Sequence, residues 1–308
     1  MKYTVFIFFS SLIWITSCSR ILVVFHMPST SHYILGNALA RGLAEAGHDV
    51  TMVSPFEEKN PPKNGKYRNV ILTGFLDDMD KQDMSVFDME GMSPFLMLPF
   101  LNFYCNELTQ NTLEHPNLQK LLKSNEHFDA VVIEQFNNDA LKVLAYHFKA
   151  PLILFSTIGA NSWINPLVGN PSPPSYIPDA LLSYRPDMTF HQRLVNWLFT
   201  VVSELNRQLL FFPTQNKMMK EHFPDAPDLS ILNYNASIVL LNSHESINQA
   251  VPLVPNMIDV GGFHVNPPKE LPKDLKDYMD GAKEGVVYFS MGSNIKPSMM
   301  PKEKKTPY

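Results

Sequence analysis

One histidine and two carboxylates stand where they could deprotonate a substrate hydroxyl. His32 begins an expected helix that follows a buried strand at residues 21–25, and Glu134 directly follows a later strand at residues 130–133. Open α/β sheets bind ligands beyond the carboxyl ends of their strands. There, an imidazole can accept a hydroxyl proton while a carboxylate fixes its tautomer and stabilises its protonated form. These two residues, with Asp139 as the reserve carboxylate, form a candidate acid–base pair.

Position alone favours a simpler interpretation of the same residues. A histidine in a first helical turn can merely contact solvent, and a carboxylate at a strand end is often a helix cap or a solvated group. Other histidines also lie in expected loops or at element ends, namely His26, His48 and His264. The sequence contains no CxxC, HExxH, GxGxxG or Walker spacing, so no metal or phosphate-loop motif suggests another site.

Alternating strands and helices are expected to position these residues. Short apolar runs with β-branched members are typical of buried parallel strands, and they occur at residues 21–25, 50–53, 70–72, 130–133, 152–155, 238–241 and 257–260. Helices are expected at residues 32–46 with Ser31 as N-cap, over most of 82–122 with interruptions at Pro94 and Pro99, and at 140–148. This order predicts an α/β class with a Rossmann-like, doubly wound, mostly parallel sheet.

The segment at residues 190–212 predicts an amphipathic helix. It is too polar to span a bilayer, because Arg193, Glu204 and Arg207 interrupt it. Its apolar residues recur at helical spacing, namely Leu194, Trp197, Leu198, Val201, Leu205 and Leu209. We expect this stripe to face the core, with peripheral membrane contact as the alternative. The proline-rich segment before it, at 166–187, is expected to form a long ordered loop.

The first residues predict a cellular compartment. Lys2, an uncharged apolar run at 5–15 and the small residues at 16–19 have the three parts of a secretory signal, so residues 1–19 are expected to direct the chain to the endoplasmic reticulum lumen. The alternative is a buried N-terminal strand or helix. After processing, Cys105 would be the only cysteine, which excludes an internal disulfide. A net charge of -5 without a basic stripe gives no reason to expect nucleic-acid binding.

A composition change predicts the domain organisation. Residues 20–265 are expected to form one domain, and the charged, proline-rich stretch at 266–284 a linker with a short helix at 273–282. The apolar run at 285–289 is typical of a buried strand and leads into a turn of small residues. We expect residues 285–308 to be the start of a second α/β domain, represented by this first strand alone.

Several motifs occur in the order found in one enzyme family. They are SHY at 31–33, AGHDVT at 46–51, FD at 128–129, PPSYIP at 173–178, VGGFH at 260–264 and GVVYFSMGSN at 285–294. Over residues 20 to about 300 the chain therefore resembles the UDP-glucuronosyltransferases, especially the insect members. The resemblance implies a two-domain GT-B fold. It also implies inverting transfer of glucuronic acid or glucose from a UDP-sugar co-substrate, without a cofactor or metal, to a hydroxyl of a small lipophilic acceptor.

The resemblance also implies roles for particular residues. It places the family's general base on His32, which reverses the interpretation from position alone, and the supporting acid on Glu134, where many relatives carry Asp. Asp139 stays the reserve. For the acceptor pocket we expect a wall formed by Phe95, Phe100, Phe103 and Tyr104, with a plain core cluster as the alternative. For the UDP phosphates the matching residues are Ser290, Gly292 and Ser293.

The family's Trp-x-Pro-Gln and His-Gly-Gly donor motifs do not occur in this sequence. We therefore expect these 308 residues alone not to turn over, and to represent a truncated isoform or an incomplete gene model of an active transferase. The alternative function is a lumenal acceptor-binding or dimerising module that regulates full-length family members as a homo- or hetero-oligomer. A third possibility is a non-functional product whose exposed last strand makes it misfold.

Overall fold

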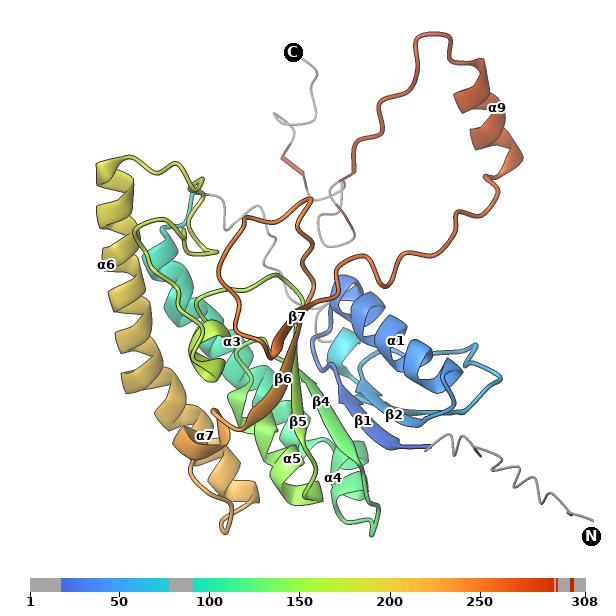
Figure 1. The fold of residues 1–308 in the computed structure, drawn as a ribbon. Helices are drawn as coiled ribbons and strands as arrows, with labels where there is room; N and C mark the ends of the chain where they lie inside the picture. Colours follow the sequence, from blue (N-terminus) through green and yellow to red (C-terminus); the bar gives the residue numbers. More distant parts are fainter. Residues whose placement is uncertain (1–17, 78–90, 291, 293–299, 302–308) are drawn as a thin grey trace, which may run out of the picture.

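The computed structural model describes residues 18–77, 91–290, 292 and 300–301 (Figure 1). Within them a parallel sheet of seven strands has the order β3-β2-β1-β4-β5-β6-β7. The strands are β1 (Arg20–Val24), β2 (Asp49–Ser54), β3 (Lys66–Ile71), β4 (Ala130–Glu134), β5 (Leu152–Ser156), β6 (Ala236–Leu241) and β7 (Met257–Asp259). Every strand expected between residues 21 and 260 is present, and the predicted doubly wound α/β fold is confirmed.

Helices cover both faces of this sheet. They are α1 (Thr30–Glu45), α3 (Pro94–Glu114), α4 (Pro116–Leu122), α5 (Val143–Phe148), α6 (Phe190–Asn206), α7 (Phe212–His222) and α8 (Leu229–Leu232). A further helix, α9 (Lys273–Gly281), lies away from the sheet. Tighter or wider turns lie between them, namely η2 (Asp139–Lys142), η3 (Asn165–Val168) and the π turn η4 (Arg207–Phe211). Figure 1 shows α1 on one side of the sheet, and α3, α6 and α7 on the other.

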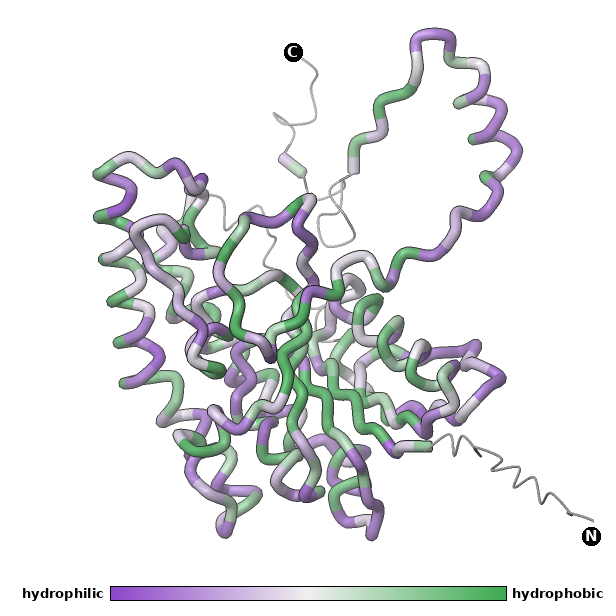
Figure 2. Tube along the Cα trace, viewed as in Figure 1, coloured by the Kyte–Doolittle hydropathy of each residue, from purple (hydrophilic) through white to green (hydrophobic). Residues whose placement is uncertain are grey.

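The core has two parts because strand side chains alternate between the faces. Ile21 and Val23 of β1 pack with α1 in one cluster, whereas Leu22 and Val24 belong to the larger cluster with α4 and α5. Figure 2 shows the strands as the hydrophobic centre of the molecule. Gly36 brings α1 close to the sheet, since a Cβ there would lie 2.5 Å from the ring of Phe25. Packing of α1 therefore fixes the position of its first turn.

The helix boundaries differ in part from the prediction. α1 begins at Thr30 with Ser29 in the N-cap position, not at His32 with Ser31. Pro94 occupies the first turn of α3, where a missing N–H needs no helical partner. Pro99 lies inside α3, and the helix continues through it to Glu114. The predicted interruption at Pro99 is therefore wrong.

The apolar stripe of α6 does not face the core, so that prediction is wrong. The residues Leu194, Trp197, Leu198, Val201, Leu205 and Leu209 are between 36% and 68% exposed. The buried residues of this helix are Asn196 and Phe199. Asn196 donates to the carbonyls of Pro174 and Ile177 and accepts from the amide of Asp179. The inward face therefore carries Phe199, which belongs to a small apolar cluster, and Asn196, which pairs with buried backbone groups of the adjacent loop.

The segment expected to form a last strand, residues 285–289, has no strand conformation and is exposed, with Val287 at 95%. A strand needs a neighbour for its N–H and C=O groups, and none is paired with this segment in the described part of the chain. The expected short helix is present as α9, which has no buried residue and stands apart from the sheet (Figure 1). Apart from residues 18 and 19, the expected signal lies outside the described residues.

Candidate functional site

The structure brings His32 and Glu134 together at one edge of the sheet. β1 and β4 pair with Val24 opposite Ile133, and the strand order reverses between them. Open α/β sheets bind ligands at such a reversal. The loop after β1 leads to His32 in the first turn of α1, and Glu134 is the last residue of β4. His32 Nδ1 is in hydrogen-bond contact with Glu134 Oε1.

The environments of the two side chains differ. Glu134 is fully buried, and its second oxygen, Oε2, has no hydrogen-bond partner among the described residues. The His32 side chain is 18% exposed, and its ring packs edge-on against Phe136 at 5.2 Å between centroids. A carboxylate beside Nδ1 favours the tautomer with the proton on that nitrogen. The lone pair of Nε2 is then available to accept a proton.

The reserve carboxylate, Asp139, is engaged elsewhere. Its Oδ1 accepts from Lys142 Nζ at 2.5 Å and from Gln135 Nε2 at 3.2 Å. Lys142 also donates to Asn233 Oδ1 at 2.9 Å, and both charged side chains are almost completely buried. Burial lowers the pKa of Lys142 from its ordinary value, while Asp139 opposes that shift. The structure therefore places Glu134, and not Asp139, beside His32.

His26 lies next to the pair, although the sequence indicated only a loop histidine. It is fully buried after β1, and its Nδ1 accepts from Asn138 Nδ2 at 3.3 Å. Asn138 also donates to the backbone carbonyl of Glu134 at 2.7 Å. Burial first, and the nearby charge of His32 second, lower the pKa of His26 to about 3. His26 is therefore a neutral neighbour of the pair at ordinary pH.

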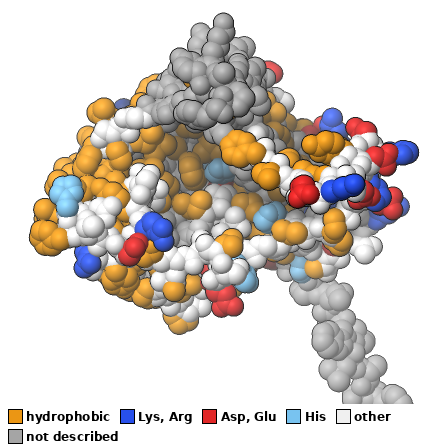
Figure 3. All heavy atoms as spheres, turned by 90° about the horizontal axis from the view of Figure 1, so that it is seen from above, with side chains coloured by type: hydrophobic (Ala, Val, Ile, Leu, Met, Phe, Trp, Pro, Cys, Tyr) orange, Lys and Arg blue, Asp and Glu red, His pale blue; other side chains and the backbone are white. Residues whose placement is uncertain are grey.

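A cavity of about 400 Å³ lies near this pair, between α3, α6 and the loop after β5. His32 and Glu134 are not among the residues that line the cavity. The ring of Phe136 lies between the pair and the cavity, because it packs against His32 and, at 5.9 Å, edge-on against Trp163, which lines the cavity. Asn137 of the same loop also lines the cavity and has a positive φ of 49°. Asparagine tolerates this backbone conformation better than most residues. Seen from above in Figure 3, the surface of the molecule has a hollow with hydrophobic side chains on its wall.

The aromatic residues predicted as the acceptor wall are not among the lining residues. Phe95 packs against Phe199 at 5.1 Å, Tyr104 packs on the main core, Phe100 is half-buried, and Phe103 is 70% exposed. The same helix, α3, lines the cavity with Leu98, Leu101 and Asn102 instead. Their i, i+3, i+4 spacing was a signal for this face. The cavity is therefore lined by another face of α3, and the acceptor wall at the four aromatic residues stays a prediction.

Ser290 and Gly292, two of the three predicted donor residues, are exposed. The amide of Gly292 donates to Ser290 Oγ at 3.4 Å, and Ser293 lies outside the described residues. Within the described parts of the chain, no cluster of His, Cys, Asp and Glu is arranged to hold a metal ion. Nor does this part contain a helix with the length and apolarity needed to cross a bilayer.

Solved structures that match this chain do so with TM-scores below 0.5. A protein titled LpCGTa in complex with UDP matches with a TM-score of 0.39 and 15% identity, covering 86% of this chain and 56% of that one. A Phytolacca americana UGT2 complexed with UDP-2fluoro-glucose and pterostilbene has a TM-score of 0.38 and 13% identity, over 86% of this chain and 57% of that one.

Sequence comparison is more decisive. UDP-glycosyltransferase UGT5 of Dactylopius coccus is 32% identical over 99% of this chain and 59% of its own length. Mouse UDP-glucuronosyltransferase 1A7 is 27% identical over 94% of this chain and 56% of its own length. The chain thus spans little more than half the length of these relatives. The sequence model described as "UDP-glucoronosyl and UDP-glucosyl transferase" matches residues 22–306. Because this match covers almost all of the 308 residues, the chain belongs to that family of transferases.

Proposed function

We propose that this chain supplies the acceptor-binding half of an inverting UDP-sugar glycosyltransferase, with His32 as the general base. The observation that carries the proposal is the contact between His32 and buried Glu134, beside a cavity of about 400 Å³. Family membership supports the reaction class. The transferred sugar is glucose or glucuronic acid, and the acceptor is a small lipophilic molecule with a hydroxyl group.

The proposed step moves one proton and exchanges one bond. An acceptor hydroxyl placed against Nε2 of His32 gives its proton to that nitrogen as the hydroxyl oxygen attacks the anomeric carbon. The bond between that carbon and the UDP oxygen breaks on the opposite face, so the configuration inverts and UDP leaves. Glu134 holds the Nδ1 proton and stabilises the imidazolium that forms, in the role of a triad carboxylate.

The chain spans 59% of its Dactylopius coccus relative, so the test joins it to the remaining part of that relative. Transfer from UDP-glucose and from UDP-glucuronic acid to a phenol would be measured by mass spectrometry. His32→Ala should lower kcat by about 10²–10⁴-fold, the usual contribution of a positioned general base. His191→Ala is the matched control, because His191 is exposed on α6. A His32→Ala chimera with kcat within about threefold of the parent would remove His32 from the mechanism.

Acceptor binding without transfer is a second candidate function for the 308 residues, and the cavity itself favours it. The chain alone would then bind acceptors and modulate longer family members. Co-expression with such a member tests this candidate. Unchanged activity and unchanged assembly of the longer protein would count against it.

We also propose that residues 1–19 direct the chain into the endoplasmic reticulum lumen. Asn235, in a sequon with Ser237, is exposed just before β6 and would report lumenal entry by carrying a glycan. In insect cells, protease protection of the full chain and its loss on deletion of residues 1–19 are the expected results. Equal protease sensitivity of both forms would contradict the proposal.

A further inference from the structure

The outer side of α6 and of the π turn η4 is an apolar surface that nothing covers in the described structure. Figure 1 shows α6 on the outside of its helical layer, at the left of the molecule. The exposed apolar residues along it, here called the α6 stripe, are Phe190, Leu194, Trp197, Leu198, Val201, Leu205, Leu209 and Leu210. Their exposed fractions run from 36% at Val201 to 82% at Phe190. Monomeric soluble proteins rarely expose a contiguous apolar patch of more than a few hundred Å², so the stripe is expected to have a partner.

The helix that presents the stripe is held rigidly from behind. Thr189 and Gln192 form a reciprocal capping box at its first turn. On the buried side, Asn196 donates to two backbone carbonyls of the preceding loop, and the ring of Phe199 packs against Phe95 at 5.1 Å between centroids. A surface that is already ordered loses little conformational entropy when it binds. The stripe is therefore a preformed surface and not a segment that must first fold.

The stripe has the size that a dimer interface requires. Its eight large side chains are on average about half exposed, so together they present on the order of 800 Å². A standard protein–protein interface buries about 800 Å² on each partner. A second copy of the same surface would therefore cover the stripe with an interface of ordinary size.

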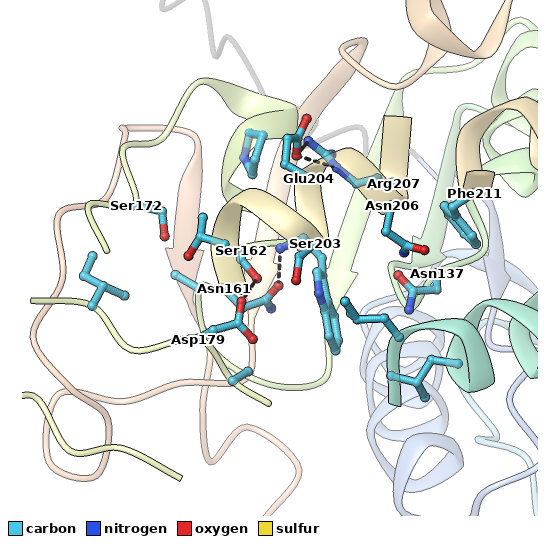
Figure 4. Close-up of a pocket in the computed structure, with 18 of the residues that line it drawn as sticks. Asn137, Asn161, Ser162, Ser172, Asp179, Ser203, Glu204, Asn206, Arg207 and Phe211 are labelled. Atoms are coloured by element: carbon cyan, nitrogen blue, oxygen red, sulfur yellow. Dashed lines mark hydrogen bonds and ion pairs between the residues drawn. The ribbon is translucent and has the colours of Figure 1, made fainter. Parts of the chain in front are cut away.

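The charges beside the stripe argue against a lipid surface as its partner. Helices that lie on membranes carry several lysines and arginines beside the apolar face. Over residues 190–206, the charged side chains are one arginine, Arg193, and one glutamate, Glu204. The next cation, Arg207, is already paired, since its Nη2 donates to Glu204 Oε2 at 2.5 Å (Figure 4). The border of the stripe is therefore balanced in charge and not basic.

The order of residues along the stripe suits a second copy of the same helix. A two-fold interface places one surface against a reversed copy of itself. Six residues of the stripe follow one another at intervals of four, four, three, four and four, which read the same in both directions, namely Phe190, Leu194, Leu198, Val201, Leu205 and Leu209. Two antiparallel α6 helices can therefore bring Leu198 against the partner's Val201 at the centre, and Leu194 against the partner's Leu205 beside it.

The same arrangement brings opposite charges together. Arg193 of one copy then lies beside the segment that carries Glu204 of the other, and the Glu204 side chain is 46% exposed. We propose that two copies of this chain form a dimer by antiparallel packing of their α6 stripes. This inference goes beyond the proposed function, because the transfer step does not use this surface. His32→Ala should keep the dimer, and a chimera that transfers no sugar would leave the inference intact.

Sedimentation equilibrium of the chain, purified from insect cells without detergent, tests the dimer. We expect twice the monomer mass and a dissociation constant of about 1 µM or below, as interfaces of this size allow. Leu198→Glu places two carboxylates at the centre of the paired helices, so it should weaken association at least about 100-fold. Ile34→Glu is the matched control and should leave association within about twofold, because Ile34 is 49% exposed on α1, across the sheet from α6 (Figure 1).

Mixed variants test the antiparallel register. Val201→Lys alone should also dissociate the dimer, because it buries two ammonium groups at the centre. An equal mixture of Leu198→Glu and Val201→Lys should form a heterodimer, since the new carboxylate then faces the new ammonium. Leu209→Lys is the control for this pairing. It lies about 12 Å further along the helix than Val201, so its mixture with Leu198→Glu should not restore the heterodimer.

Three results would overturn the inference: a parent chain that stays monomeric at about 50 µM, a dimer that a folded Leu198→Glu variant leaves unchanged, or a mixture that forms no heterodimer. A monomer that floats with phosphatidylcholine vesicles would assign the stripe to a lipid surface instead. If Leu198→Glu melts more than about 5 °C below the parent, the next facing pair, Leu194→Glu with Leu205→Lys, replaces the two variants and decides by the same criteria.

Discussion

Two carboxylates near the end of β4, Glu134 and Asp139, have opposite surroundings. Asp139 accepts from Lys142 and Gln135, and the Lys142 ammonium is shared with Asn233, all within the core. Glu134 contacts His32 through one oxygen, and the other oxygen has no partner in the described structure. The Asp139 network is buried, with Gln135 Oε1 and Asn233 Nδ2 unpaired among the described residues, whereas the Glu134 pair ends in a partly exposed imidazole. A partly exposed imidazole can exchange a proton with a ligand, and the buried ion pair is shielded from one.

The sharpest test of this contrast is Glu134→Gln, made in the chimera used for His32. The amide can donate to Nδ1 and thereby hold the wrong tautomer, so kcat should fall by about 10²–10⁴-fold. The free energy of unfolding should change by less than about 1 kcal/mol, because shape is kept and one hydrogen bond is retained. Steady-state kinetics and urea unfolding measure the two quantities.

Asp139→Asn is the control for that variant, with the opposite expected outcome. It should lower stability while the folded fraction keeps its kcat, because Asp139 contacts Lys142 and Gln135 and not His32. If Glu134→Gln retains full kcat, or if Asp139→Asn loses as much, the assignment of the two carboxylates would be reversed or void.

Removing the cation of the buried Asp139 network should produce the next largest effect. Lys142→Met leaves Asp139 charged and buried without its ion-pair partner, which typically costs about 3–5 kcal/mol of unfolding free energy. Urea unfolding measures this loss. The double variant Lys142→Met with Asp139→Leu should recover more than half of it, because neither charge then remains buried. A loss below about 1 kcal/mol in the single variant would show that the pair is not closed in solution.

Part of this arrangement could be predicted from the sequence. Apolar runs located the strands, and the expected strand ends made His32 and Glu134 a candidate pair, which the family resemblance then favoured over a solvent-exposed histidine and a capping carboxylate. The ion pair of Asp139 with Lys142 also had a signal in the sequence, because Lys142 follows Asp139 at the i, i+3 spacing that a helical turn brings together.

Features that depend on tertiary partners could not be predicted in this way. Asn196 lies on the inward face of α6 because it binds loop backbone groups that no local pattern places beside it. Aromatic content suggested Phe103 as a pocket wall, but composition does not say which face of α3 points inward. Likewise, that Arg207 Nη1 lacks a partner is visible only once every neighbour is positioned.

The smallest expected effect concerns the second imidazole. His26 contacts the neutral amide of Asn138, whereas His32 contacts a carboxylate. Burial lowers the pKa of His26 from 6.5 to about 3. The unfolded chain therefore binds a proton that the folded chain does not, so this contribution to stability is complete above pH 6.5 and declines as pH falls toward 3.

Between about pH 7 and pH 5.5 this linkage should cost about 1 kcal/mol of unfolding free energy, and His26→Gln should remove that part of the slope. The lowered pKa values of the Glu58 and Glu126 carboxyls act at lower pH, so they do not contribute in this window. Urea unfolding at several pH values measures the difference. Identical slopes for the parent and His26→Gln would show that His26 takes up a proton in the folded chain, and the contrast between the two imidazoles would then disappear.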